Sequence, residues 1–261
     1  MPEGNVLVSV DTRGVATITL NRPEVHNAFD DETIERLTRE LRTLGDDEDV
    51  RVVLLTARGK TFCAGADLNW MKRSAEFFEA ENLQDASALA ELLQVLDALP
   101  QPTVALIQGP AYAGGVGLIC ACDIAIAARH ARFSLTEVRL GLIPAVISPF
   151  VINTIGDSYA RRYFLTGESI DSADAERIGL VHEVVPDEAL TVRGDTFVKL
   201  LLQGGPNAQA EAKNLIKAVH GRTLDGDMLV DLAKRIARIR VSDEGQEGIN
   251  AFLEKRKPRW R

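Results

Sequence analysis

The chain is 261 residues long and 46% hydrophobic, so it can bury a substantial core as one domain. Its formal charge of −8 argues against a nucleic-acid surface, which requires a basic stripe. No apolar run reaches the ~18 residues that cross a bilayer, and the first residues lack the pattern of a secretory signal or a transit peptide. The three cysteines, Cys63, Cys120 and Cys122, predict reduced thiols in a cytoplasmic protein.

The first half of the chain alternates extended and helical patterns. Residues 6–11 and 15–21 flank a turn and predict a β-hairpin. Asp30 and Asp31 are N-cap candidates for a helix with regularly spaced leucines and an isoleucine on one face. The later elements that the pattern predicts are a strand at 51–57, a helix at 83–99, and strands at 103–108 and 123–128.

Helical periodicity dominates from residue 187 onward, with a break at Gly-Gly-Pro, residues 204–206. We therefore expect two regions in the chain. The first is a core over residues 1–205, and the second is an α-helical region over residues 206–261.

Two glycine-rich stretches each follow an apolar run rich in β-branched residues. Residues 62–71 read Phe-Cys-Ala-Gly-Ala-Asp-Leu-Asn-Trp-Met, and residues 109–117 read Gly-Pro-Ala-Tyr-Ala-Gly-Gly-Val-Gly. A strand, a glycine-rich turn and a helix in succession leave backbone N–H groups free at the helix start. Two such turns that converge predict a site for developing negative charge on a carbonyl oxygen. Taken alone, each stretch favours an ordinary tight turn.

Five segments in this order resemble the crotonase superfamily, the enoyl-CoA hydratases and isomerases, over nearly the whole chain. They are residues 21–29, 62–71, 109–123, 135–144 and 251–257. The resemblance implies an α/β fold, a crotonase-like ββα spiral with a C-terminal α-helical region that assembles trimers, which pair into hexamers. Within the superfamily the chain is most similar to bacterial methylglutaconyl-CoA hydratases of leucine breakdown at residues 62–71, 140–150 and 242–257.

The resemblance implies a backbone oxyanion site with one acid–base residue. The N–H groups of Ala66 and Gly114 would bind the thioester oxygen as it gains enolate character, each lowering the barrier by about 3 kcal/mol. Glu137 matches the second of the two glutamates that hydratases of this superfamily use. Shielding by neighbouring apolar side chains would raise its pKa for proton transfer; those neighbours are Leu135, Leu140 and Ile143. The ordinary alternative is a surface glutamate paired with Arg139.

The chain departs from the superfamily pattern at Gly117, which stands at the position of the first catalytic glutamate. One carboxylate can still deliver a proton to C2 and take one from water, but water must be positioned by another group. We expect the glycine to leave space near the β-carbon, which a branched or carboxylated acyl chain could fill.

Further residues are implied to bind the acyl-CoA: Val25, Ala28, Ala64, Ala66, Asp67, Leu68, Asn69, Gly114, Gly117 and Lys255. Asp67 has an alternative role as a helix N-cap. Lys255 matches a lysine that reaches the CoA phosphates of a neighbouring subunit, and a solvated basic tail explains it equally well. No histidine or cysteine pair has i, i+4 spacing, so no metal site is expected. No cofactor is implied, because CoA arrives with the substrate.

Three functions remain open from the sequence. The favoured one is a lyase that hydrates an α,β-unsaturated acyl-CoA, with 3-methylglutaconyl-CoA as the preferred substrate. A Δ3,Δ2-enoyl-CoA isomerase is the first alternative, because a single glutamate suits a proton shuttle from C2 to C4. The more remote alternative is a non-catalytic acyl-CoA or RNA binding module, which the net charge and the retained Glu137 disfavour.

Overall fold

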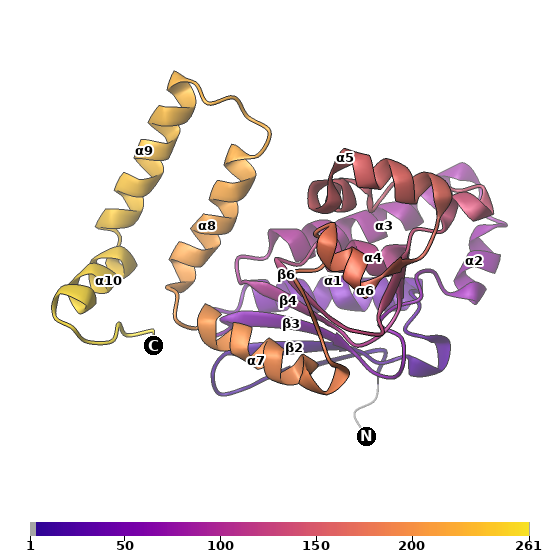
Figure 1. Cartoon of the computed structure of the whole chain (residues 1–261), viewed down its shortest axis with the longest axis horizontal. Helices are drawn as coiled ribbons and strands as arrows, with labels where there is room; N and C mark the ends of the chain where they lie inside the picture. The colour runs from indigo at the N-terminus through magenta and orange to yellow at the C-terminus, as the bar shows by residue number, and fades with distance from the viewer. Residues whose placement is uncertain (1–3, 261) are drawn as a thin grey trace.

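A computed structural model describes residues 4–260 of the chain (Figure 1). Its centre is a six-stranded sheet in the order β1-β2-β3-β4-β6-β9. The strands are β1 (Val6–Val10), β2 (Val15–Leu20), β3 (Val52–Ala57), β4 (Thr103–Ile107), β6 (Ile124–Ala128) and β9 (Glu183–Val185). β1 and β2 pair antiparallel, which confirms the predicted hairpin, and all later neighbours pair parallel. The strands predicted at 51–57, 103–108 and 123–128 are β3, β4 and β6.

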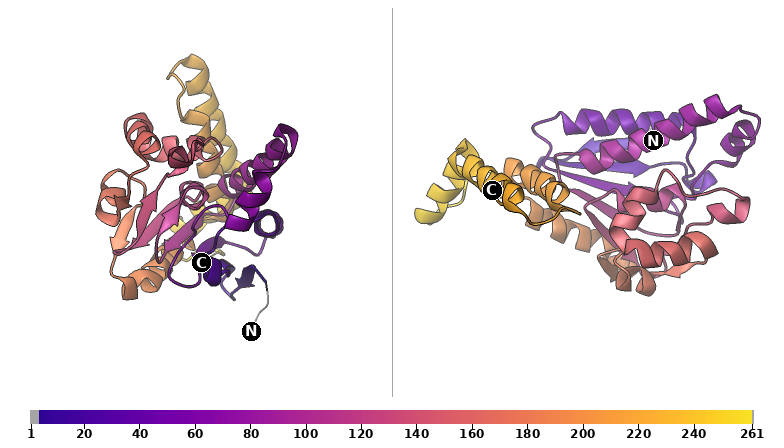
Figure 2. Two further views of the ribbon diagram at one scale, coloured as in Figure 1. Left: turned by 90° about the vertical axis from the view of Figure 1, so that its right-hand side faces the viewer. Right: turned by 90° about the horizontal axis from the view of Figure 1, so that it is seen from above.

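Helices cover both faces of this sheet (Figures 1 and 2). α1 (Asp31–Gly45) and α3 (Glu79–Ala98) pack against each other on one face, and α7 (Leu190–Leu201) packs against β4 and β6 on the other. Asp30 is the N-cap of α1, because its Oδ1 accepts the Thr33 N–H at 2.9 Å. α3 begins four residues earlier than predicted, where the Glu81 carboxylate accepts the Phe78 N–H at 2.8 Å.

A smaller sheet and several short elements connect the central strands. The sheet has the order β5-β7-β8, with β5 (Ala111–Tyr112), β7 (Arg132–Ser134) and β8 (Ile170–Asp171). The short helices are α2 (Leu68–Ser74), α4 (Gly114–Cys120) and α6 (Ser172–Arg177), and α5 (Ser148–Thr166) is longer. Three 3-10 turns complete the core: η1 (Pro23–Val25), η2 (Glu137–Leu140) and η3 (Asp187–Ala189).

The last three helices extend from one end of the layered core (Figures 1 and 2). They are α8 (Pro206–Val219), α9 (Gly226–Val241) and α10 (Asp243–Leu253), so the predicted helical C-terminal region is present. Polar contacts join them to the core: Lys213 Nζ lies 2.7 Å from Asp123 Oδ2, and Arg51 donates to the carbonyls of Gly204 and Trp260. The division of the chain at residues 205 and 206 stays a prediction. None of the helices between residues 4 and 260 is long and apolar enough to span a bilayer.

Candidate active site

The first glycine-rich stretch is held by the segment that precedes α1. The Phe29 N–H donates to the Gly65 carbonyl, and the Asp67 N–H donates to the Phe29 carbonyl, both at 2.7 Å. These two bonds form an isolated parallel bridge between Phe29 and Ala66. In such a bridge the N–H of Ala66 points away from Phe29. Among residues 4–260 this N–H has no hydrogen-bond acceptor, so it is free to bind a ligand.

The second stretch turns sharply into α4. Ala113, the residue before the helix, has φ 48° and ψ −116°, a conformation that costs on the order of 1–3 kcal/mol for a residue with a side chain. Its N–H donates to the Ser134 carbonyl at 2.9 Å. Gly114 then opens the helix, and its N–H also has no acceptor within the described part of the chain.

The two stretches lie in direct contact, which only small residues allow. A Cβ on Gly115 would lie 2.7 Å from the Cys63 carbonyl oxygen, and one on Gly65 would lie 3.2 Å from the Ala113 Cβ. Gly65 also has φ +83°, which favours glycine. Ala66 and Gly114 directly follow the contacting residues Gly65 and Ala113, so the two residues whose N–H groups are free lie on adjoining parts of the two stretches.

Glu137 follows closely on the strand that anchors this second turn. It is the first residue of η2, three residues after Ser134. Its Oε2 is buried and has no hydrogen-bond partner in residues 4–260. Burial raises the pKa of the Glu137 carboxyl above its ordinary value. No ion pair joins it to Arg139 within the described chain, and the Arg139 Nη2 lies 3.5 Å from the Thr166 carbonyl oxygen instead.

The shielding of Glu137 differs in part from the sequence expectation. Leu135 is buried as expected, but Leu140 and Ile143 are 62% and 74% exposed. The prediction that these two side chains cover the carboxylate is therefore wrong for this structure. The chain turns outward after η2, where Gly141 adopts φ +74° and the Leu142 N–H donates back to the Glu137 carbonyl at 3.1 Å.

The expected space at Gly117 is absent. Gly117 is buried, and a Cβ at this position would lie 2.4 Å from Ile147 Cγ2 and 3.3 Å from Leu93 Cδ1. Ile147, at the start of α5, is only 3% exposed. Its side chain fills the volume that the missing side chain leaves, so the prediction of a cavity for a branched acyl chain is wrong. Gly117 instead allows α4 and α5 to pack closely.

Asp67 has the role that its N-cap alternative described. Its Oδ1 accepts the N–H groups of Asn69 and Trp70 at 2.8 and 3.3 Å, and its Oδ2 lies 3.1 Å from Arg22 Nη2. Burial alone would raise the pKa of this carboxyl, but these hydrogen bonds and the Arg22 guanidinium lower it. Because the side chain is 5% exposed and both oxygens are engaged, it contributes to the site by fixing the loop after Ala66.

The other predicted binding residues fall into three groups. Ala28 is buried, Val25 and Ala64 are half-buried, and Leu68 and Asn69 at the start of α2 are exposed. Lys255 is exposed beyond the end of α10, with φ 55°. In Figure 1, α10 lies at the opposite end of the molecule from α2, so the structure does not bring Lys255 to Ala66 within one chain. Its role in binding CoA stays a prediction.

Two residues that hold the site were not singled out from the sequence. Phe29 pairs with both neighbours of Ala66, and Arg22 Nη1 donates to the Ala28 carbonyl at 2.7 Å while its Nη2 also pairs with Asp30 at 2.9 Å. Both lie in the segment 21–29, whose sequence carries no sign of contacts with residues forty positions away.

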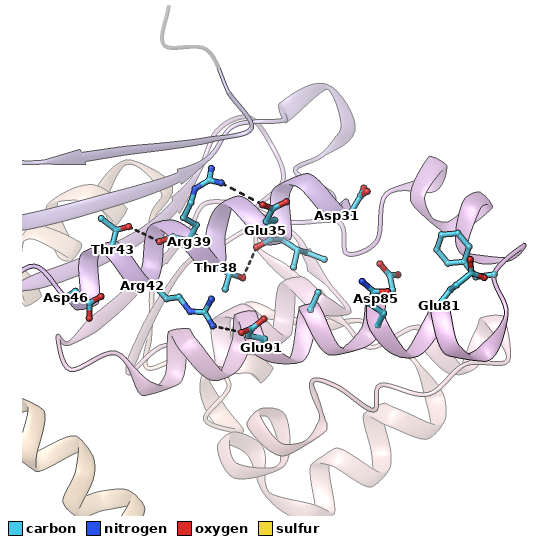
Figure 3. A pocket seen from close by; sticks show the side chains of 14 residues that line it. Asp31, Glu35, Thr38, Arg39, Arg42, Thr43, Asp46, Glu81, Asp85 and Glu91 are labelled. Atoms are coloured by element: carbon cyan, nitrogen blue, oxygen red, sulfur yellow. Dashed lines mark hydrogen bonds and ion pairs between the residues drawn. The ribbon is translucent and has the colours of Figure 1, made fainter.

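A large groove lies elsewhere, between α1 and α3 (Figure 3), with a volume of about 820 Å³. Two ion pairs lie within it, Arg42 with Glu91 and Arg39 with Glu35, and Ala66, Gly114 and Glu137 are not among its lining residues. Between residues 4 and 260, no group of three His, Cys, Asp or Glu side chains could hold a metal ion. The absence of a cofactor stays a prediction.

Comparisons with known proteins agree with this architecture. The model of the enoyl-CoA hydratase/isomerase family matches residues 11–261. A crystal structure of an enoyl-CoA hydratase from Shewanella pealeana has a TM-score of 0.96 and 44% identity, covering 98% of this chain and 96% of that one. Pseudomonas aeruginosa AtuE has a TM-score of 0.94 and 38% identity, covering 98% and 99%. Enoyl-CoA hydratase AFT6-1 of Alternaria alternata is 36% identical over 263 residues, 99% of this chain and 85% of that protein.

These likenesses confirm the α/β crotonase fold with its helical C-terminal region. Most of the chain matches the family model, and relatives align over nearly its full length. The chain belongs to the enoyl-CoA hydratase/isomerase family and has that family's activity on acyl-CoA.

Proposed function

We propose that this enzyme hydrates an α,β-unsaturated acyl-CoA thioester. The observation that carries the proposal is the Glu137 carboxylate, with a buried, unpartnered oxygen and a raised pKa, three residues from the strand end that anchors the turn before Gly114. A carboxyl of this kind suits proton transfer near neutral pH. The free N–H groups of Ala66 and Gly114, on adjoining stretches, support the proposal, because thioester chemistry needs hydrogen-bond donors for the carbonyl oxygen.

In the proposed reaction the thioester oxygen accepts hydrogen bonds from the N–H groups of Ala66 and Gly114. Water adds through its oxygen to C3, the C2–C3 double bond breaks, and its electron pair moves onto the thioester oxygen as an enolate. The protonated Glu137 carboxyl delivers its proton to C2, and the resulting carboxylate takes a proton from the added water. The sum is water plus enoyl-CoA giving 3-hydroxyacyl-CoA, with Glu137 restored.

The proposed substrate is 3-methylglutaconyl-CoA. Its support is the sequence resemblance at residues 62–71, 140–150 and 242–257, since the space expected at Gly117 is filled by Ile147. The relatives described above carry only the general name of enoyl-CoA hydratase, where a name is given. A branched diacid is therefore the first compound of a substrate panel, with crotonyl-CoA as its unbranched comparison.

A Δ3,Δ2-enoyl-CoA isomerase is the second candidate, and one observation favours it. The apolar Ile147 packs against Gly117, at the position of the carboxylate that this chain lacks, so that side of α4 is buried and apolar. An isomerase needs one group to move a proton from C2 to C4 and no activated water. Glu137 alone supplies that group.

We also propose that the chain assembles into a trimer or a pair of trimers in the cytoplasm. The C-terminal helices support the first part, because they expose large apolar side chains that another copy could cover. The most exposed on these helices are Ile216, Val241, Phe252 and Leu253, and Leu224 is exposed in the loop between α8 and α9. Light scattering of the purified protein measures the mass directly, and a monomer would contradict the proposal.

Incubation in oxygen-18 water distinguishes the two candidate reactions. The purified enzyme is incubated with 3-methylglutaconyl-CoA, crotonyl-CoA or a 3-enoyl-CoA, and the masses of the products are measured by mass spectrometry. A hydratase yields a hydroxyacyl-CoA that carries one heavy oxygen from the solvent. Movement of the double bond in the 3-enoyl-CoA without heavy oxygen in any product would instead establish an isomerase and reject the first proposal.

A further inference from the structure

Phe29 contacts both glycine-rich stretches, through different parts of the residue. Its backbone N–H and C=O form bonds of 2.7 Å with Gly65 and Asp67, the residues on either side of Ala66. The peptide that carries the Ala66 N–H is thus held at both ends by one residue. This pairing fixes the direction in which the N–H points.

The ring of Phe29 lies against the other donor. A Cβ built on Gly114 would lie 3.1 Å from the ring Cε2 and 3.2 Å from the ring Cδ2. The ring is therefore in close contact with the first residue of α4. Phe29 is only 1% exposed, so its ring is packed inside the protein and does not form the surface on which a substrate lies.

The backbone around Phe29 is itself anchored. Arg22 donates to the carbonyl of Ala28, the residue before Phe29, at 2.7 Å, and pairs with Asp30, the residue after it, at 2.9 Å. The Arg22 side chain is 16% exposed, so water screens these contacts only in part. Phe29 is consequently a rigid spacer with one end on Ala66 and the other on Gly114.

We infer that Phe29 is a positioning residue that sets the separation between the Ala66 and Gly114 N–H groups. The inference rests on the proposed function, in which these groups bind the thioester oxygen. Misplacement of a hydrogen-bond donor by about 1 Å can cost on the order of 100-fold in rate, because the donors act on charge that develops in the transition state. A smaller side chain at position 29 removes the contact that holds the start of α4 in place relative to the Ala66 loop, and it weakens enolate binding more than substrate binding.

The test compares Phe29→Leu with Leu41→Ala. Leu41 lies in α1, is 2% exposed and belongs to the same core, but it is outside both glycine-rich stretches and the strands that pair with them. Both variants remove the same number of carbon atoms from a packed interior, so their melting temperatures should fall by similar amounts. Phe29→Met, which keeps more of the volume, serves if Phe29→Leu fails to fold.

Three readouts separate positioning from packing: kcat, KM, and the ultraviolet absorbance of bound acetoacetyl-CoA. This thioester loses a C2 proton to form an enolate that absorbs in the near ultraviolet, so its spectrum reports enolate binding without turnover. Phe29→Leu is expected to lower kcat about 10- to 100-fold with KM changed less than about threefold, and to abolish the enolate band. Leu41→Ala should keep the band and a kcat within about threefold of wild type.

Retention of both kcat and the enolate band in Phe29→Leu would overturn the inference. An equal loss in Leu41→Ala would show that Phe29 acts only through general packing of the core. Absence of the band and of turnover in the wild-type enzyme would reject the proposed function itself, and the role of Phe29 with it. The measurement on the wild-type enzyme therefore distinguishes failure of the proposed function from failure of the positioning role of Phe29.

Discussion

Replacement of Gly117 by alanine tests how α4 and α5 pack beneath the candidate site. The added Cβ would lie 2.4 Å from Ile147 Cγ2 and 3.0 Å from Ile147 Cβ. Rotation of the Ile147 side chain can move the γ carbon but leaves the Cβ in place, and the backbone there is fixed by the first turn of α5. The contact must therefore be relieved by shifting one helix.

The size of the effect follows from two opposing terms. Overpacking a core costs typically 1–3 kcal/mol, whereas replacing a helical glycine by alanine gains about 1 kcal/mol. The contact is well inside van der Waals distance and involves a β-branched partner, so we expect the cost to win. Gly117→Ala should lower the free energy of unfolding by about 1–2 kcal/mol.

The partner residue supplies matched backgrounds for this measurement. Ile147→Val keeps the Cγ2 methyl, so Gly117→Ala should destabilise that variant as much as wild type. Ile147→Ala removes the methyl but keeps the Cβ, and costs about 2–5 kcal/mol by itself; in that background only the 3.0 Å contact with the Cβ and the 3.3 Å contact with Leu93 remain, so Gly117→Ala should cost less than in wild type. Urea unfolding followed by circular dichroism measures all six proteins. An equal effect of Gly117→Ala in all three backgrounds, or a stabilised single variant, would refute the packing account and restore an open space at Gly117.

Three further predictions concern the residues around the two N–H groups. Burial raises the pKa of the Glu137 carboxyl in the folded protein, so the ionised carboxylate destabilises the fold. The free energy of unfolding is therefore greatest below the ordinary carboxyl pKa, and this contribution is lost as the pH rises through the pKa of the folded protein. Glu137→Gln should therefore melt higher than wild type at pH 7 and equally at pH 4, and equal melting at both would contradict the burial. Asp67→Ala, which removes the N-cap of α2 and leaves Arg22 without a partner there, should cost about 1–2 kcal/mol in urea unfolding. Asp67→Asn, which keeps the cap, should cost less, and the reverse order would reject capping as the main role. Ala113→Gly should relieve the positive φ and raise stability by about 1 kcal/mol, whereas a loss would show that the turn is unstrained.

The sequence was sufficient for elements whose cause is local. Asp30 could be identified as an N-cap because capping depends on a side chain and an N–H three residues apart. The two glycine-rich turns were predicted because each stretch follows an apolar run rich in β-branched residues, and Gly65 has φ +83°, a local requirement that favours glycine. The family resemblance then implied the ββα spiral and the helical C-terminal region.

Contacts between distant segments could not be predicted in the same way. Ile147 lies thirty residues beyond Gly117 in the sequence, and nothing in the spacing of apolar residues indicates which one fills the space beside a glycine. The ring of Phe29 against Gly114 is a contact of the same kind. The outward turn after Glu137 also escaped prediction, because apolar residues such as Leu140 and Ile143 are ordinarily assigned to the interior.

The central claim is that Glu137 transfers a proton at C2 of a thioester whose oxygen is bound by backbone N–H groups. The rate at which deuterium from the solvent is incorporated at C2 tests this claim most directly. Wild type and Glu137→Gln are incubated in deuterium oxide with the enoyl-CoA that wild type turns over fastest, and deuterium at C2 of the product is measured by mass spectrometry. The amide has the same shape and no proton to deliver, so the variant should place deuterium at C2 at least about 100-fold more slowly. Undiminished deuteration by a folded Glu137→Gln protein would contradict the claim and assign the proton to another group.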